Sequence, residues 1–541
     1  MQKIIQQTRK LFLSAQGGMF SSAIILSFMI VVSRIFGFMR YRILAGYFTK
    51  DELDIFFASF RIPDLVFELI ITGAITSTFI PIFIKYSGDE RERSKIISSI
   101  INIILIVLTV LIILILPFMT PIVTLITPGF HGEKLHSIVV FSQWLLVSQL
   151  PFLVLGNFLT GIAQARKQFL ITTLPPIIYN VSVILATFAL APSIGLYAPI
   201  LGVIGGALLF TIIQLPVVID ELKTYRFTIE LHTGVKEFFR MIGPRILTIV
   251  TAQIDATIDL TLTTLLGSGA YTIFYFAQHL QLLPVSVIGM SFGQASLPYL
   301  SELAEANKQK ELTKIVTESI MNVFFMTMPI AVYFIFARTP LTRMFFGGEK
   351  FDWDGTVQTA FLLSYFSVSI PFHAVYYLLT RCFYALLDSR TPFYASITGV
   401  IANTVLSLVF ILVFKLPVWA LGISFSLSMI LQDAILFFLL HKKISFDIPH
   451  FLLSFGKIMF ASFISAPIPY IIIKLMDNLL LDTTRTINIF FLLCASAIVY
   501  GLLYLFVSWF IGVQELYIIS QLTVKAKQFQ KKITEMYLSY D

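Results

Sequence analysis

Apolar segments of about twenty residues or more recur along almost the whole chain, separated by short stretches rich in charge, glycine or proline. One such segment, folded as a helix, crosses the roughly 30 Å hydrocarbon core of a bilayer. Of the 541 residues, 57% are hydrophobic and 13% charged, unlike a soluble domain. Membrane β-barrel strands are short and alternate in polarity. The sequence therefore predicts an all-α integral membrane protein.

Division at charge clusters and turn residues predicts fourteen transmembrane helices. Their expected ranges are 19–41, 53–85, 95–119, 135–164, 168–191, 197–220, 237–267, 270–302, 312–337, 355–387, 391–414, 417–441, 450–475 and 486–512. Basic residues gather in alternate connections, on the same side as both termini. Because cytoplasmic loops carry an excess of Lys and Arg, we expect both termini in the cytoplasm. Topology therefore explains the net charge of +8 better than nucleic-acid binding does.

A faint internal repeat, in which residues 57–81 resemble residues 276–298, suggests two halves of six helices each. Paired repeats with a binding site between them are a recurrent plan in transporters. The predicted organisation is an interfacial N-terminal helix that stays attached (1–18), an N-lobe (19–222), a C-lobe (223–445), two further helices (446–512) and a basic cytoplasmic tail (513–541).

Charged residues inside the first predicted helices are costly to place in a bilayer and so indicate function or pairing. They include Arg34, Arg40 and Arg42, followed by Asp54, Arg61, Asp64 and Glu68. Arg61, Asp64 and Glu68 fall on one helix face, so one hypothesis is a structural cluster whose charges neutralise one another. The alternative is an anion-binding cavity, because guanidinium groups pair with phosphate oxygens in a fork geometry. Arg42 is expected instead to extend toward the interface.

The second half of the chain also carries ionisable residues within its predicted helices. They are Arg245, Asp255, Asp259, His279, His373, Arg381 and Asp433. Asp255 and Asp259 are four residues apart and share a helix face. Asp259 is a candidate for ion coupling, or alternatively a buried partner of Arg245 or Arg381. His279 is either a satisfied core histidine or a proton relay.

Several classes of site have no support in the sequence. Cys382 and Cys494 both fall within predicted helices, so neither a disulfide framework nor a thiolate metal site is expected. No nucleotide-binding glycine motif occurs. We therefore expect a carrier without a cofactor, driven by an ion gradient (Na⁺ or H⁺) or by the membrane potential, and not an enzyme.

The stretch SRIFGFMR at 33–40, followed by LDIFFASFRIPDLVFELIITGAITSTFIPIF at 53–83, resembles the N-terminal signature of the MurJ (MviN) family of lipid II flippases. The resemblance continues at 276–304 and 385–393, and outside the N-terminal motif it is generic to the MATE-like exporter superfamily. It implies two six-helix lobes in a V-shaped arrangement, with the last two helices forming a groove for a lipid tail. The implied substrate is undecaprenyl-pyrophosphate-linked lipid II, moved to the outer leaflet of the bacterial inner membrane by alternating access.

The resemblance also implies roles for particular residues. Arg34 and Arg40 match essential arginines of the family, and Asp54 matches an acidic position. Asp259 resembles an acidic residue that in some members helps to bind sodium, together with an asparagine that matches Asn403. The implied substrate-binding residues are Arg34, Arg40, Asp54, Arg61, Asp64 and His279, and the ion-coupling residues are Asp255, Asp259 and Asn403.

The chain departs from the family pattern at several positions. Phe67 and then Glu68 stand where many members have an arginine, and His279 stands where members have a second arginine. Asp64 replaces an asparagine, and Leu282 replaces a glutamate. These changes lower the positive charge available to a pyrophosphate. An exporter of another polyprenyl-linked oligosaccharide, a MATE-type cation antiporter and a membrane scaffold are therefore the alternatives. Expected partners are the lipid-linked substrate, membrane lipids and cell-wall synthesis proteins, with the chain itself a monomer.

Overall fold

The computed structural model describes residues 19–71, 78–86, 88–166, 168–230, 232–477 and 481–517. All regular structure in these ranges is helical, which confirms the predicted fold class. Eleven helical segments are long and apolar enough to cross a membrane. They match eleven of the expected ranges. The predicted interfacial helix 1–18 and most of the tail 513–541 lie outside the described residues.

The three remaining expected ranges, 19–41, 53–85 and 237–267, are not among the eleven, so the count of fourteen is not confirmed. The second range is divided into short helices, and the helix over the third carries charges along its length. In the first range, the side chains of residues 19–28 lie outside the described part.

The chain divides into two compact units, which we describe separately. Unit 1 comprises the described residues up to Ile273 together with Phe345–Gly355, and unit 2 comprises Phe274–Met344 and the described residues from Thr356 onward. The predicted lobe boundary at 222/223 stays a prediction. In the described structure, the long helix after residue 223 packs on α4, α6 and α7 of unit 1.

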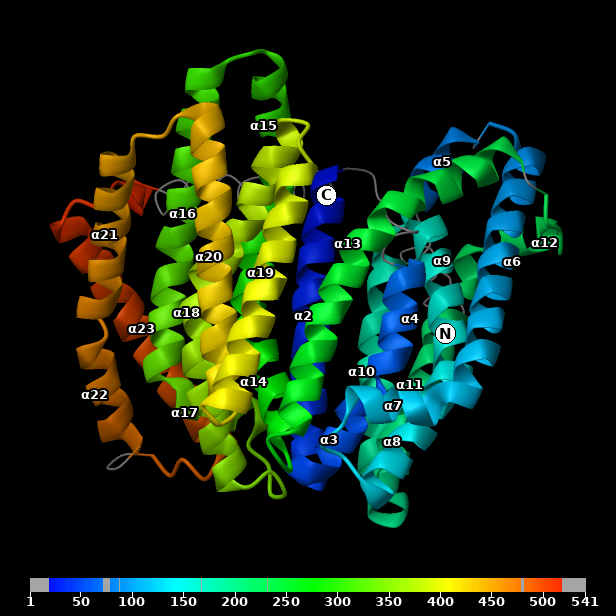
Figure 1. Cartoon of the computed structure of the whole chain (residues 1–541), viewed down its shortest axis with the longest axis horizontal. Helices are drawn as coiled ribbons and strands as arrows, with labels where there is room; N and C mark the ends of the chain where they lie inside the picture. Colours follow the sequence, from blue (N-terminus) through cyan, green and yellow to red (C-terminus); the bar gives the residue numbers. More distant parts are fainter. Residues whose placement is uncertain are drawn as a thin grey trace, which may run out of the picture. The chain divides into compact units, whose positions relative to one another are not determined.

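Unit 1 is built from helices in which several long rods alternate with short, broken segments (Figure 1). Its elements are α2 (Met19–Tyr47), α3 (Lys50–Ser59), α4 (Arg61–Ile71), α5 (Ile80–Lys85), α6 (Glu90–Ile115), η2 (Leu116–Phe118), α7 (Met119–Ile126), α8 (Gly132–Trp144), η3 (Leu145–Gln149), α9 (Leu150–Ala165), α10 (Phe169–Ile194), α11 (Tyr197–Ile212), η4 (Leu215–Val217), α12 (Ile219–Thr224) and α13 (Thr233–Thr264).

Two local features fix the helices of unit 1. Thr49 and Glu52 form a reciprocal capping box that starts α3. Helices α10 and α11 pack closely because Gly202 and Gly206 face α10, where a Cβ atom on Gly202 would lie 2.8 Å from the Val183 backbone. Helix α10 also packs on α2. The unit therefore holds its charged helix α2 against an apolar pair of helices.

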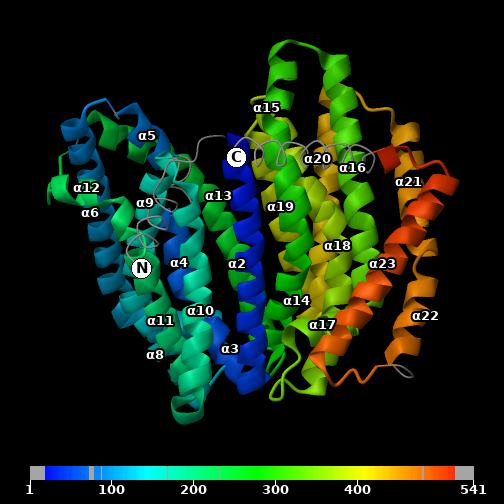
Figure 2. The ribbon, with the colours of Figure 1, turned by 180° about the vertical axis from the view of Figure 1, so that it is seen from behind.

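Unit 2 contains most of the remaining helices, seen from behind in Figure 2. Its elements are α14 (Ala270–Pro284, whose first turn belongs to unit 1), η5 (Val285–Met290), α15 (Ser291–Glu305), α16 (Gln309–Phe336), α17 (Arg338–Phe346, whose end belongs to unit 1), α18 (Trp353–Ala385, whose start belongs to unit 1), α19 (Arg390–Leu408), η6 (Val409–Val413), α20 (Trp419–Ile444), α21 (Ile448–Ile464), α22 (Pro467–Leu475), α23 (Thr486–Phe510) and η8 (Gln514–Leu516).

The two predicted C-terminal helices are present in unit 2 as α21 with α22 and as α23. They contact one another and both contact α16. Tyr500 and Tyr504 on α23 are buried and donate hydrogen bonds of 2.9 Å to backbone carbonyls of α21 and α16. Because a buried phenol needs a partner, these bonds fix how α23 packs.

Candidate functional site

Arg34 lies on an otherwise apolar, exposed part of α2. Its neighbours Ile30, Val31 and Ile35 are all more than half exposed, and Arg34 is exposed too. Within the part of the chain that the structure describes, Arg34 has no hydrogen bond or ion pair. A guanidinium among apolar side chains of a membrane protein needs water, a headgroup or a ligand.

Arg40, one and a half turns along α2, is half-buried against other polar groups of unit 1. Its guanidinium carbon lies 4.7 Å from the centre of the Tyr41 ring. Its charge also interacts with Asp64 on α4 and with Tyr179 on α10. The Tyr179 hydroxyl accepts a hydrogen bond of 3.2 Å from Gln149. Arg40 is thus part of a polar cluster that connects α2, α4 and α10.

Arg61 links α4 to α13. Its Nε donates to Thr257 Oγ1 at 3.0 Å, and its Nη2 donates to the carbonyl and the side-chain oxygen of Gln253 at 2.5 and 2.8 Å. The sequence predicted a positive charge for an anion cavity at this position. The structure gives the guanidinium a structural function as well, because three of its bonds hold α13 against α4.

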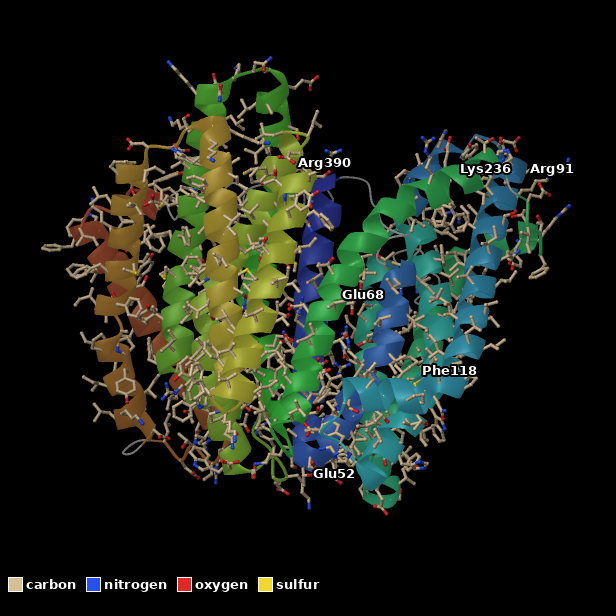
Figure 3. All side chains as sticks on the ribbon, viewed as in Figure 1. Glu52, Glu68, Arg91, Phe118, Lys236 and Arg390 are labelled. Carbon is tan, nitrogen blue, oxygen red and sulfur yellow. The ribbon has the colours of Figure 1, made fainter. Side chains whose placement is uncertain are left out.

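Asp64 and Glu68 lie close enough to Arg61 for their charges to interact. This proximity is what the hypothesis of a self-neutralising cluster requires. Asp64 is nevertheless exposed and also interacts with Arg40. The cluster therefore brings two arginines and two carboxylates together on one side of α4 (Glu68 is labelled in Figure 3).

Asp54 on α3 is fully buried, at 0% exposure. One carboxylate oxygen accepts from Lys134 Nζ at 2.9 Å and from the Gly269 N–H at 2.7 Å, and the other accepts from the N–H and hydroxyl of Thr272, both at 2.8 Å. In this arrangement the carboxylate has no surface to offer a substrate. The predicted substrate contact gains no support, and Asp54 instead joins α3, α8 and the start of α14.

Asp255 and Asp259 lie on the same side of α13, as their spacing predicted. Asp259 is buried, at 5% exposure, and its charge interacts with Arg61 and Tyr271. The alternative hypothesis of a buried partner for an arginine is therefore compatible with Arg61, while pairing with Arg245 or Arg381 stays a prediction. The side chain of Arg245 lies outside the described part, and Arg381 belongs to unit 2.

His279 and Asn403 belong to unit 2. The His279 ring packs at a tilt of 31° on the Tyr275 ring with ring centres 4.0 Å apart, and its Nδ1 lies 2.8 Å from the Tyr275 carbonyl oxygen. Asn403 is buried at 3% exposure. Their predicted roles, including a sodium site shared by Asp259 and Asn403, remain predictions. In the described ranges, no group of three or more His, Cys, Asp or Glu residues could hold a metal ion.

Asp433 on α20 is a feature to which the sequence gave no function. It is 5% exposed, and neither carboxylate oxygen has a hydrogen-bond partner in the described structure. It lines a cavity of about 180 Å³ whose other walls are apolar side chains of α16, α18, α20 and α21. The sequence feature that could have indicated this site is a single acidic residue within the otherwise apolar predicted helix 417–441.

Comparison with known proteins gives consistent results. The family model described as lipid II flippase MurJ matches residues 45–513, which leaves Arg34 and Arg40 outside the match. A probable lipid II flippase MurJ of Rickettsia prowazekii is 27% identical over 402 residues, covering 72% of this chain and 78% of the relative. A probable lipid II flippase MurJ of Buchnera aphidicola (subsp. Acyrthosiphon pisum) is 27% identical over 510 residues, covering 90% and 96%.

Solved structures give the same result at the level of the fold. A lipid II flippase MurJ in an inward closed conformation matches with a TM-score of 0.75 and 25% identity, covering 90% of this chain and 98% of that one. An inward-facing MATE family multidrug resistance transporter matches with a TM-score of 0.65 and 13% identity, covering 78% and 98%. The second likeness concerns the fold alone.

Proposed function

The chain belongs to the MurJ family of lipid II flippases, and from this premise we propose that it moves lipid II from the inner to the outer leaflet of a bacterial cytoplasmic membrane. The match over residues 45–513 and the coverage of 96% of the Buchnera aphidicola relative support this proposal. In this function the chain binds and releases a lipid without breaking a bond. It acts as a carrier and not as an enzyme.

The observation that carries the proposal is Arg34, exposed on the apolar part of α2. Lipid II joins a polyprenyl tail to a sugar-peptide headgroup through a pyrophosphate. A guanidinium is always charged and donates two parallel hydrogen bonds to phosphate oxygens. Arg40 adds positive charge six residues further along the same helix. These residues suit an anion that enters from the membrane.

The mechanism follows from this chemistry as a further part of the proposal. Alternating access would expose the arginines first to the inner and then to the outer leaflet, with both termini cytoplasmic. The driving force would be an ion gradient or the membrane potential. Asp255, Asp259 and Asn403 are the residues on which sodium or proton coupling would depend. The chain would work as a monomer beside cell-wall synthesis proteins.

A complementation experiment tests the proposed function. The resident lipid II flippase of a bacterium is depleted while this chain is expressed, and growth and wall synthesis are measured. We expect the chain to restore both, and Arg34→Ala to restore neither at the same membrane level. Arg390→Gln, an exposed arginine of unit 2, is the matched control and should behave like the unchanged chain. Failure of the unchanged chain at a normal membrane level would refute the proposal.

A transporter of another polyprenyl-linked oligosaccharide is the second candidate. Phe67 and His279 stand where the family resemblance implies arginine, and they favour this candidate because they lower the positive charge available to the headgroup. Such a lipid shares the pyrophosphate, so Arg34 would serve it equally well. Complementation separates the two candidates, because only a lipid II flippase restores peptidoglycan synthesis.

A further inference from the structure

A stripe of small polar residues on α6 binds the backbone of the connection between α12 and α13. Ser94 donates to the Thr224 carbonyl at 2.6 Å, and Asn102 donates to the Arg226 and Thr228 carbonyls at 3.2 and 3.0 Å. The N–H groups of Arg226 and Glu230 donate to Ser98 and Ser99 at 3.3 and 3.1 Å. These bonds hold an extended segment, residues 225–230, along α6.

Two adjoining cavities lie where this segment meets α6. The first, of about 340 Å³, is lined by Glu90, Arg91, Ser94, Lys95, Lys223, Thr224 and Arg226. The second, of about 240 Å³, is lined mainly by apolar side chains, namely Ile97, Ile101, Leu105, Leu155, Leu159, Ile162, Val218 and Tyr225, with Arg93, Ser94, Ser98 and Thr224. Ser94 and Thr224 line both cavities, so the polar cavity and the apolar cavity adjoin.

Among the described residues that line the polar cavity, basic side chains outnumber acidic ones. Four of the seven lining residues are basic and one is acidic, and Lys95 has a second acidic neighbour in Glu230, whose carboxylate lies 3.6 Å from Nζ. Arg91, Lys223 and Arg226 are exposed. The balance of charge at the cavity therefore favours an anion with several oxygen atoms, because Lys and Arg both bind phosphate.

The order of the two cavities along α6 matches the order of groups in a membrane lipid. The polar cavity lies at the first turns of α6, near Arg91, and the apolar one extends to Leu105, about 21 Å further along the helix. Figure 3 shows Arg91 and Lys236 at the same end of unit 1. This helix belongs to a candidate membrane span, Glu90–Ile126. A headgroup at Arg91 would thus place its acyl chain in the bilayer.

The extended segment, residues 225–230, carries exposed apolar side chains of the kind found at a membrane–water interface. Its alternate residues Phe227 and Ile229 are 77% and 54% exposed, while the backbone between them is bound to α6. Exposed aromatic and aliphatic side chains beside basic ones are typical of a segment that lies at the membrane–water boundary. Phe227 and Ile229 would therefore insert among the lipids that surround the cavity.

We propose that these two cavities form a binding site for an anionic phospholipid of the surrounding bilayer. The phosphate occupies the basic cavity beside Lys223 and Arg226, and part of one acyl chain occupies the apolar cavity beside Leu105 and Leu159. The proposal is independent of the transported substrate, because every residue in it belongs to α6, α9, η4, α12 and their connections. Basic pockets between membrane helices are established phospholipid-headgroup sites in general.

Native mass spectrometry of the full chain in detergent micelles tests the site. Dioleoyl phosphatidylglycerol and dioleoyl phosphatidylcholine are added separately, and the bound fraction is measured against concentration. We expect tighter binding of phosphatidylglycerol, and about 30-fold weaker binding after the double change Lys223→Gln and Arg226→Gln, at about 1 kcal/mol for each basic residue. Lys310→Gln with Arg390→Gln, two exposed basic residues of unit 2, is the control and should leave binding unchanged.

A second variant tests the apolar cavity and leaves the charges in place. Leu105→Trp fills this space, and Leu105→Phe is a smaller alternative if the first fails to fold. Either should weaken phosphatidylglycerol binding without changing binding of glycerol phosphate, which has no acyl chain. Equal binding of both phospholipids, unchanged binding in the Lys223/Arg226 variant, or binding of lipid II but not of phosphatidylglycerol at these residues would overturn the proposal. None of these results bears on the complementation test of transport.

Discussion

Asp54 in unit 1 and Asp433 in unit 2 are both buried carboxylates, but their surroundings differ completely. Asp54 is 0% exposed and accepts four hydrogen bonds, one of them from Lys134. Asp433 is 5% exposed and has no hydrogen-bond partner in the described structure. The same residue type is thus part of a satisfied network in one unit and faces an apolar cavity in the other.

The difference shows two ways in which this protein buries a carboxylate. A buried charge without a partner costs several kcal/mol, and a partner with good geometry repays much of that cost. The hydrogen bonds of Asp54 and Arg61 offset the cost of their burial, and each residue connects helices that are far apart in sequence. Asp433 makes no such connection. Its retention is therefore not explained by the stability of this arrangement.

Replacing Asp54 by Ala should have the largest effect. Lys134 would lose its buried partner, and the Gly269 and Thr272 donors would lose their acceptor. We expect a loss of about 3–5 kcal/mol in the free energy of unfolding, measured by denaturation in detergent micelles. Lys134→Met in the Asp54→Ala background should recover part of the loss. A loss below about 1 kcal/mol would mean that the network does not hold α3, α8 and α14 together.

Replacing Arg61 by Leu should have a smaller effect of the same sign. The change removes three hydrogen bonds to Gln253 and Thr257 and the positive charge that interacts with Asp259. We expect a loss of about 2–3 kcal/mol in the free energy of unfolding. Arg61→Lys should recover little, because an ammonium lacks the fork geometry. Full stability of Arg61→Leu would show that α13 is held to α4 by apolar packing alone.

Replacing Asp433 by Leu should have the opposite sign. An apolar side chain of similar size removes an unpartnered polar group from an apolar site. We expect the free energy of unfolding to rise by about 1–2 kcal/mol. Asp433→Asn, which keeps a polar group there, is the control and should give no gain. Destabilisation by Leu as large as that caused by Asp54→Ala would mean that Asp433 has a partner that stabilises the fold.

The smallest expected effect concerns Asp388, in the connection between α18 and α19. Partial burial raises the pKa of its carboxyl group, but hydrogen bonds from Lys443 at 2.6 Å and from Thr391 lower it more, so the pKa lies below its ordinary value. The ion pair therefore contributes stability at neutral pH, which is lost as the pH falls from about 4 toward the lowered pKa.

Asp388→Asn should accordingly lower the free energy of unfolding by under about 1 kcal/mol at pH 7 and remove this part of its pH dependence. Unfolding measured in detergent micelles from pH 3 to pH 7 checks the prediction. An unchanged pH dependence would show that the Asp388–Lys443 pair contributes nothing to the stability of the α18–α19 connection.

The sequence was sufficient to predict the helical class, the family and eleven of the expected membrane segments, because these depend on local apolar runs and a motif. It also placed Asp255 and Asp259 on one face, since four residues make about one helical turn. It did not predict the function of Asp54, whose partners Lys134 and Thr272 are 80 and 218 residues away. The contact of α13 with α4 was not predicted for the same reason, because the bonds from Arg61 that hold α13 on unit 1 cross 192 to 196 residues.

Translocation in reconstituted vesicles tests the central claim most directly. Purified protein is placed in vesicles that contain labelled lipid II, and the fraction of label that becomes accessible to a membrane-impermeant reagent is followed over time. The account predicts faster exposure than in protein-free vesicles and a return to the protein-free rate with Arg34→Ala. Exposure at the protein-free rate with the unchanged protein, or an unchanged rate with Arg34→Ala, would contradict it.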